Sequence, residues 1–348
     1  MNNRVLFSSH PLIGNTKIQA GLVAAIPSDQ LGAAPELPAA LIIWRQAEAG
    51  LFSVIGTVLR SLEVAEWLGA VPIVDTINFS TAYSRSSQVD LWNELFEPPG
   101  KMTIRQLTAA RSDYRIFFTD GGHPAKDTVD PERLNVYRDF WFRYIQIKPR
   151  VLLEIETGLS LVGVSNKTLG IHFRGGDMRT APRHPLPPTL NQLRQRAKTL
   201  LDSTDMDTIY VATNVSGAIS ELRKTFGNRV LPSPQYLGQS NETNKAPFSS
   251  SRPPQSRFWK SMQVNKQDGS GKSVCHAIDA LMDVVALSRC GGLVCGDSNV
   301  SLFSQVIAKE SHRFVVKIEN GQNATSRLPA RFKWYVRATL PPGLGGFR

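Results

Sequence analysis

The alternation of apolar and polar positions in the first part of the chain predicts one α/β unit. The apolar run at 39–44 is typical of a buried strand, and 71–75 predicts the next strand. Between them a helix is predicted from Gly50 to Gly69, because apolar residues recur with a helical period, at Val54, Val58, Leu62, Ala65 and Leu68. A strand, a glycine turn, a helix and a second strand open a doubly wound α/β domain. The glycines do not match the GxGxxG spacing of dinucleotide-binding turns, which argues against an NAD site.

A similar alternation fills the second half of the chain. Strands are predicted at 169–173, 208–213, 229–231 and 292–295, and helices at 190–201, 218–226, 274–290 and 300–309. Residues 76–150 are expected to mix short helices and loops, with an aromatic-rich helix at 131–144. The polar tract at 232–273 is long enough to be either a functional loop, shaping the acceptor side, or disordered. The simplest architecture is α/β, with Rossmann-like domains over 1–150 and 151–348 and a cleft between them.

The charge balance favours an anionic partner. The 348 residues are 41% hydrophobic and 20% charged, and the formal net charge is +11. This balance suits polyanions, nucleotides or anionic membrane surfaces. The basic residues are scattered, and aromatic residues are not interleaved with glycines as in RNA-binding sheets, so nucleic acid is not the expected partner.

The lack of a recognisable targeting signal and the small number of cysteines favour a reducing compartment. No run approaches the roughly 18–20 apolar residues that a membrane span requires, and the N-terminus lacks the apolar core of a signal peptide. Three cysteines argue against a disulfide framework. Cys290 and Cys295 have no second pair or histidine cluster beside them, so no structural zinc is expected. We therefore expect a cytoplasmic protein without a bound metal.

The segment 171–184 carries the most chemistry. Its apolar strand ends in Arg174, and the Gly175-Gly176 turn that follows lets backbone approach a phosphate closely. Open α/β sheets bind anionic ligands at the carboxyl ends of their strands. In one interpretation Arg174 holds a diphosphate and neutralises charge on a departing nucleotide, and in the other it pairs with a surface carboxylate. The apolar strand and the glycine turn favour the first.

Three polar residues around this turn have open roles. Asp177 would act as a base, orient Arg174 or cap the following turn. His172 alternates with Arg174 along the strand, so both are expected on one face. It would contact a ligand or be a buried, hydrogen-bonded histidine. His184 lies in a loop before Pro185.

Further candidate ligand contacts lie in the last quarter of the chain. Asp279 and Asp283 are four apart on an apolar helix, where a carboxylate requires a partner. Asp279 is expected near the N-terminal end of that helix, where negative charge is favourable. Asp283 would pair with a ligand hydroxyl or with Arg174. An anion site or a simple helix cap is predicted in the turn of Gly296, Asp297, Ser298 and Asn299.

Three of these segments together resemble motifs of the GDP-fucose-dependent fucosyltransferases, the superfamily of the α1,6-fucosyltransferases, rhizobial NodZ and the protein O-fucosyltransferases. Residues 172–177 resemble the family's HxRxxD motif. The strand at 209–214 is similar to a family strand that ends in Ala-Thr and an acidic pair. Residues 282–295, with the turn at 296–301, resemble the third motif, which has a helical aspartate and a Ser-rich turn around the nucleotide.

This resemblance implies a GT-B fold in which the C-terminal domain holds most of the nucleotide sugar. It implies inverting, metal-independent transfer of fucose from GDP-fucose to a glycan, glycoconjugate or peptide acceptor, with no cofactor. The family arginine that corresponds to Arg174 holds the β-phosphate and assists departure of GDP. Contacts to the donor are expected from the glycine turn and from Thr213, Asn214, Asp283 and the 296–299 turn.

The chain departs from the family at three places. Gly175 stands where many relatives carry a second arginine, and Asn214 and Val215 stand where relatives carry the acidic pair. No glutamate lies between Asp177 and His184 to serve as the general base, so the base has no assigned residue. A transferase for another GDP-sugar and an inactive sugar-nucleotide-binding relative are the alternative functions. The sequence does not indicate the acceptor, the linkage or the oligomeric state.

Overall fold

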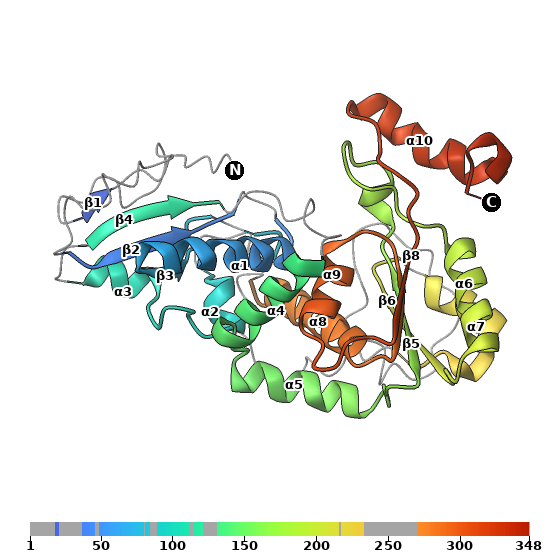
Figure 1. Cartoon of the computed structure of the whole chain (residues 1–348), viewed down its shortest axis with the longest axis horizontal. Helices are drawn as coiled ribbons and strands as arrows, with labels where there is room; N and C mark the ends of the chain where they lie inside the picture. The colour runs from blue at the N-terminus through green and yellow to red at the C-terminus, as the bar shows by residue number, and fades with distance from the viewer. Residues whose placement is uncertain are drawn as a thin grey trace. The chain divides into compact units, whose positions relative to one another are not determined.

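The chain folds into two compact α/β units in the computed structural model. Unit 1 comprises 1–153 with 264–280, and unit 2 comprises 154–263 with 281–348. The structure describes residues 18–20, 37–45, 49–79, 81–83, 89–110, 114–120, 131–215, 217–232 and 270–347. Within these residues each unit has a four-stranded parallel sheet (Figure 1). The predicted α/β class is confirmed, whereas the boundary at 150/151 stays a prediction.

The sheet of unit 1 is built around a wholly apolar strand. Its order is β1-β4-β2-β3, formed by Ile18–Ala20, Tyr114–Thr119, Ala39–Ile43 and Ala70–Val74. Every residue of β2 is buried, as expected for an interior strand of a parallel sheet. The helix α1 (Leu51–Leu68) packs against β2 and β3. It ends at Gly69, whose left-handed φ of 59° lets its N–H close the last turn.

Short helices complete unit 1. They are α2 (Leu91–Leu95), α3 (Ile104–Ala109), α4 (Pro131–Tyr144) and the start of α5 (Pro149–Ser160). A capping box begins α3, because the Gln106 N–H donates to Thr103 Oγ1 and the Thr103 N–H donates to Gln106 Oε1. The predicted helix at 131–144 is confirmed. The expectation of only helices and loops over 76–150 is wrong, because β4 lies there.

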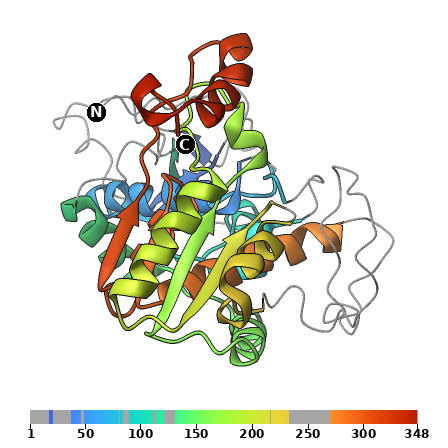
Figure 2. The ribbon, with the colours of Figure 1, turned by 90° about the vertical axis from the view of Figure 1, so that its right-hand side faces the viewer.

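The sheet of unit 2 has helices on both faces. Its order is β6-β5-β7-β8, formed by Thr208–Thr213, Thr168–Phe173, Gly292–Cys295 and Phe314–Lys317. The helices α6 (Leu190–Ser203) and α7 (Ala218–Phe226) lie in front of this sheet in Figure 2 and cover Ile171 and Phe173. On the other face a Cβ at Gly170 would come within 3.0 Å of Leu287 in α8 (Ser270–Ser288).

The strand order of unit 2 creates a topological switch between β5 and β7. From β5 the chain crosses through α6 to β6 on one side. From β7 it crosses through α9 (Asn299–Val306) to β8 on the other side. The two connections therefore leave β5 and β7 in opposite directions. Ligands of open α/β sheets bind outside the carboxyl ends of the strands at such a switch.

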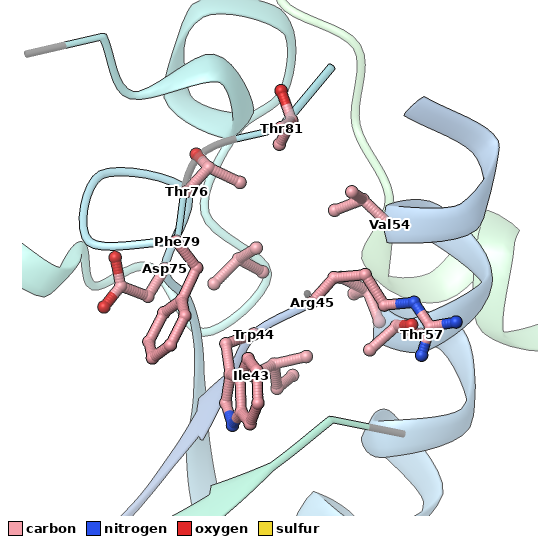
Figure 3. A pocket seen from close by; sticks show the side chains of 11 residues that line it. Ile43, Trp44, Arg45, Val54, Thr57, Asp75, Thr76, Phe79 and Thr81 are labelled. Carbon is pink, nitrogen blue, oxygen red and sulfur yellow. The ribbon is translucent and has the colours of Figure 1, made fainter. Parts of the chain in front are cut away.

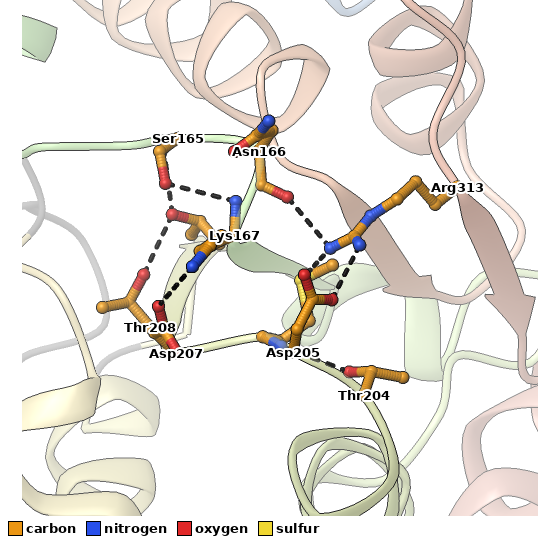
Figure 4. A network of polar contacts seen from close by, with 10 residues as sticks. Ser165, Asn166, Lys167, Thr204, Asp205, Asp207, Thr208 and Arg313 are labelled. Atoms are coloured by element: carbon orange, nitrogen blue, oxygen red, sulfur yellow. Dashed lines mark hydrogen bonds and ion pairs between the residues drawn. The ribbon is translucent and has the colours of Figure 1, made fainter.

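A polar network joins the opposite, amino ends of the same strands (Figure 4). Thr168 and Thr208 share a hydrogen bond of 2.9 Å between their hydroxyls. Arg313, just before β8, pairs with Asp205 at 2.7 Å and donates to the Asn166 carbonyl at 3.2 Å. The Arg313–Asp205 pair is exposed, so its energetic contribution is small, whereas Thr168 is buried.

Several local predictions are wrong in their bounds. Residues 229–231 form no strand, because a 3-10 turn at Gly227–Arg229 leaves Val230 with a single bridge to Ile209. The helix α8 begins at Ser270, so Asp279 lies in its middle and not near its N-terminal end. The last predicted helix ends at Val306 instead of 309.

Two elements beyond the last predicted helix were not expected. The strand β8 and the helix α10 (Arg327–Thr339) lie beyond the last predicted helix. Most of the 232–273 tract lies outside the described residues. No helix in the described part of the chain is long and apolar enough to cross a membrane.

Candidate functional site

The carboxyl edge of the unit 2 sheet gathers most of the polar residues singled out in the sequence. After β5, β6 and β7 come, in that order, Arg174 with Gly175 and Gly176, Asn214 after Thr213, and the turn of Gly296, Asp297, Ser298 and Asn299. Because the strands are parallel, all these residues lie at one edge of the sheet. This edge includes the switch between β5 and β7, where a ligand is expected.

A buried hydrogen bond joins the ends of β5 and β7. His172 Nδ1 lies 3.0 Å from Ser298 Oγ. The His172 side chain is only 4% exposed. Burial, and secondarily the Arg174 guanidinium, lower the pKa of His172 to about 3. The imidazole is therefore neutral at physiological pH. His172 is buried and hydrogen-bonded, as in one of its two predicted roles.

The turn after β7 is built around Ser298. Its Oγ caps α9 by accepting from the Ser301 N–H at 3.1 Å, while the Ser301 hydroxyl donates to the Gly296 carbonyl at 2.9 Å. A Cβ at Gly296 would lie 2.5 Å from Pro188 Cδ, so only glycine fits there. Asn299 is the first residue of α9. The capping interpretation of this turn is confirmed, and the helix N-terminus stays available for an anion.

Asp297 has a cationic partner from the neighbouring strand. Its carboxylate lies 3.5 Å from Lys317 Nζ at the end of β8, and Lys317 also lies 3.5 Å from Glu319. This pairing partly neutralises the carboxylate beside the turn. An anion that approaches the N-terminus of α9 therefore meets less repulsion.

The side chain of Val215 leaves room only for a glycine at position 175. A Cβ at Gly175 would come within 2.4 Å of Val215 Cγ2, far inside van der Waals contact. The Gly175 N–H donates to Asn214 Oδ1 at 3.3 Å. Gly176 follows with a left-handed φ of 61°. The positions at which the sequence departs from the family motifs, 175 and 214–215, therefore contact each other.

Arg179 is a candidate site residue that the sequence did not single out. It ends the 3-10 turn at Gly176–Arg179, and its guanidinium lies 4.4 Å from the centre of the Trp334 ring in α10. A Cβ at Gly175 would lie 3.2 Å from Arg179 Nη2. Within the described residues its buried Nε makes no hydrogen bond. No sequence pattern marks Arg179, because a stacking contact between residues 155 positions apart leaves no periodicity.

The helical aspartates have different surroundings. Asp283 accepts a 2.7 Å hydrogen bond from the hydroxyl of Tyr210, which is fully buried in β6. A protein hydroxyl therefore satisfies part of its need for a partner. Burial raises the pKa of Asp279 to about 7.

The sequence singled out two other polar residues near the glycine turn. The side chain of Asp177 lies outside the described residues. The His184 carbonyl accepts from the Asn323 N–H at 2.8 Å.

Unit 1 carries a small pocket at the carboxyl ends of β2 and β3 (Figure 3). The rings of Trp44 and Phe79 stack there with centroids 4.4 Å apart. Arg45 is 8% exposed and donates from Nε to Ser53 Oγ in α1 at 3.2 Å. The pKa of Arg45 is lowered, mainly by burial. The buried Asp75 accepts from the Asn78 backbone and side-chain amides. The sequence did not mark this pocket, because Arg45 belongs to no cluster or motif.

The cysteines are free thiols. Cys290 and Cys295 are buried, and burial raises the pKa of Cys295 to about 12. Within the described residues no group of three or more His, Cys, Asp or Glu side chains is placed to hold a metal ion.

Comparison with known proteins gives similarity only among solved structures. No protein-family model matches the chain, and no curated protein matches it. The fucosyltransferase NodZ from Bradyrhizobium is 14% identical, with 79% of this chain and 94% of that chain covered and a TM-score of 0.49. POFUT1 in complex with GDP is 9% identical, with 81% and 99% covered and a TM-score of 0.49. A variant of Arabidopsis thaliana FUT1 in complex with GDP is 12% identical, with 80% and 71% covered and a TM-score of 0.45.

These structures belong to the group whose motifs the sequence resembles. Their identities to this chain are too low to carry an activity over from them. What the chain binds and does must therefore follow from its own residues.

Proposed function

We propose that the chain is a glycosyltransferase that binds GDP-fucose at the carboxyl edge of the unit 2 sheet. The observation that carries this proposal is the position of Arg174 directly after β5, at the switch between β5 and β7, at the same edge of the sheet as the turn that begins α9. A diphosphate bound at this edge would meet a guanidinium from one strand end and backbone N–H groups from the other. Both are strong ligands for phosphate oxygens.

In this proposal Arg174 and Arg179 share the charge of the donor. Arg174 holds the β-phosphate, and Arg179 supplies the second positive charge that a glycine at position 175 cannot. The Arg179 guanidinium lies against Gly175 and is oriented by Trp334. Two guanidinium groups offset the charge that develops on departing GDP, so the proposed reaction requires no metal.

The remaining predicted contacts hold the nucleotide. The glycine backbone at 175–176 and the N-terminus of α9, with Asp297, Ser298 and Asn299, would line the diphosphate. Asp283, oriented by Tyr210, and the β6 end at Thr213 and Asn214 would contact the nucleoside. Asn214 already accepts from the Gly175 N–H, so one amide couples the two strand ends around the ligand.

The proposed reaction is a single displacement with inversion. The acceptor oxygen attacks the anomeric carbon of fucose while the bond from that carbon to the β-phosphate oxygen breaks. GDP leaves with the bonding electron pair, and Arg174 neutralises it. The acceptor proton passes to a base, for which Asp177 is the residue we propose. In the GT-B arrangement that we propose, unit 1 binds the glycan, glycoconjugate or peptide acceptor.

A donor panel tests this function. The purified chain is incubated with GDP-fucose, GDP-mannose and a UDP-sugar, with and without glycan and peptide acceptors, and GDP release is measured. We expect release with GDP-fucose, unaffected by a chelator, and inversion at the anomeric carbon by NMR.

The Arg174→Ala variant ties this activity to the site. Turnover should fall by about 10²-fold or more, as when one preorganised charge-stabilising donor is removed, with Arg174→Lys retaining part of it. An Arg174→Ala variant with full turnover would refute the mechanism. Release only with GDP-mannose would assign another GDP-sugar, and binding without turnover would indicate an inactive relative.

A further inference from the structure

The outward side of α10 is a continuous apolar stripe. Leu328, Phe332 and Val336, each four residues apart, are 69%, 63% and 54% exposed, and Tyr335 beside them is 49% exposed. Residues at this spacing share one helical face. A single exposed apolar side chain is ordinary, whereas a contiguous set marks an interaction surface. We call these four side chains the α10 outer face.

The opposite side of α10 packs against the rest of unit 2, so the helix already buries a separate apolar face. Ala330 and Trp334 are buried, and Trp334 Nε1 donates to the Pro187 carbonyl at 2.9 Å. Arg337 donates to the carbonyls of Asn320 and Gly345 at 2.8 and 2.7 Å. These contacts fix the rotation of the helix about its axis and leave the outer face pointing away from unit 2.

The α10 outer face is bordered by positive charge. From position 320 to 348 the sequence contains four arginines and one lysine, and no aspartate or glutamate. Arg331 and Lys333 fall on the two sides of the stripe by helical geometry, and Arg327 and Arg331 are exposed. Figure 1 shows α10 projecting beyond the end of β8.

We propose that the α10 outer face docks the protein reversibly on an anionic lipid surface. Apolar side chains that insert at the headgroup level, flanked by basic residues that contact anionic headgroups, are the pattern of interfacial helices. A second copy of this chain fits less well, because it would bring two arginine-rich borders together. The net charge of +11 acts in the same direction. This inference does not rest on the proposed transferase activity.

Vesicle sedimentation with the full chain tests the proposal. Vesicles of phosphatidylcholine are compared with vesicles that also contain about 30% phosphatidylserine. We expect at least tenfold more bound protein on the anionic vesicles, and loss of that binding when salt is raised from about 0.1 M to 0.5 M. The double variant Phe332→Ser with Val336→Ser, and the double variant Arg327→Glu with Arg331→Glu, should each lose at least tenfold.

The matched control is Trp67→Ser. Trp67 is 61% exposed on α1 in unit 1, so removing it tests whether any exposed apolar side chain has the same effect. It should bind vesicles as the wild type does, and circular dichroism should confirm that all variants are folded. Equal binding to neutral vesicles, or no binding to anionic ones, would overturn the proposal. So would a dimer, seen by light scattering, that only the Phe332 and Val336 variant dissociates.

Discussion

At the scale of single residues, the arrangement of positive charge beside β5 depends on the absence of a side chain at Gly175. Val215 and Arg179 approach the space that a Cβ would occupy, at 2.4 and 3.2 Å. An arginine at position 175 would have to displace Val215. Instead the Arg179 guanidinium, held against Trp334, lies beside the space that a Cβ at position 175 would occupy.

The Gly175→Ala substitution should be destabilising because of Val215. Overpacking of this kind costs about 1–3 kcal/mol in the free energy of unfolding. The double variant with Val215→Ala should recover most of it, since the clashing methyl is gone. Urea denaturation measures both, with Gly343→Ala as the control, because a Cβ there meets nothing within 4 Å. A loss that Val215→Ala does not relieve would show that the contact is not the cause.

The buried carboxyl of Asp279 should make stability depend on pH. Its pKa in the folded chain is about 7, raised from an ordinary 3.8. The folded state therefore binds a proton that the unfolded state has lost, and this contribution to stability disappears as pH rises from about 4 to 7. Asp279→Asn should gain stability over the wild type across that range, by up to about 4 kcal/mol above pH 7.

Denaturation at pH 5 and pH 8 measures this difference. The exposed Asp202 on α6 gives the control variant, Asp202→Asn, which should not show the same pH-dependent gain. If Asp279→Asn differed from the wild type by the same amount at both pH values, Asp279 would not be the titrating group.

At the scale of elements, the sequence predicted the strands that carry the site and missed the contacts between them. The strands β5, β6 and β7 are continuous apolar runs, which is the pattern of buried parallel strands, so their bounds were nearly right. The edge strand β8 is only partly buried, so it lacks this pattern. The helix α10 is apolar on two opposite faces, which hides its helical period.

Pairings across the fold were not predictable from local sequence. The bond of Ser298 to His172 and that of Tyr210 to Asp283 join residues 126 and 73 positions apart. The position of Ser298 before a helix predicted its cap, because capping is local. Nothing local predicts which strand its hydroxyl also meets.

The Ser298→Ala substitution tests the element that joins the two strand ends. It removes the α9 cap and the contact to His172, so the free energy of unfolding should fall by about 1 kcal/mol or more. The affinity for GDP should fall as well. Ser326→Ala is the matched control, because Ser326 is the N-cap of α10 and its side chain makes no capping hydrogen bond. Equal effects of the two substitutions on stability and on GDP binding would contradict this role of Ser298.

At the scale of the whole molecule, two α/β units offer two different carboxyl edges. In unit 1 the edge at β2 and β3 holds a small pocket with a buried arginine and stacked rings. In unit 2 the edge combines a topological switch, a capped helix N-terminus and two arginines. The second combination has the features that a diphosphate requires, so our proposal places the donor at unit 2.

Calorimetric titration with GDP and GDP-fucose tests this assignment most directly. The wild type should bind both, and Arg174→Ala and Arg179→Ala should each weaken binding by about tenfold or more, as expected when a hydrogen-bonded charge pair is lost. Arg313→Ala is the control, because it removes an arginine from the amino edge of the same sheet, and it should bind as the wild type does. Unchanged affinity in Arg174→Ala, with the fold intact, would contradict the account.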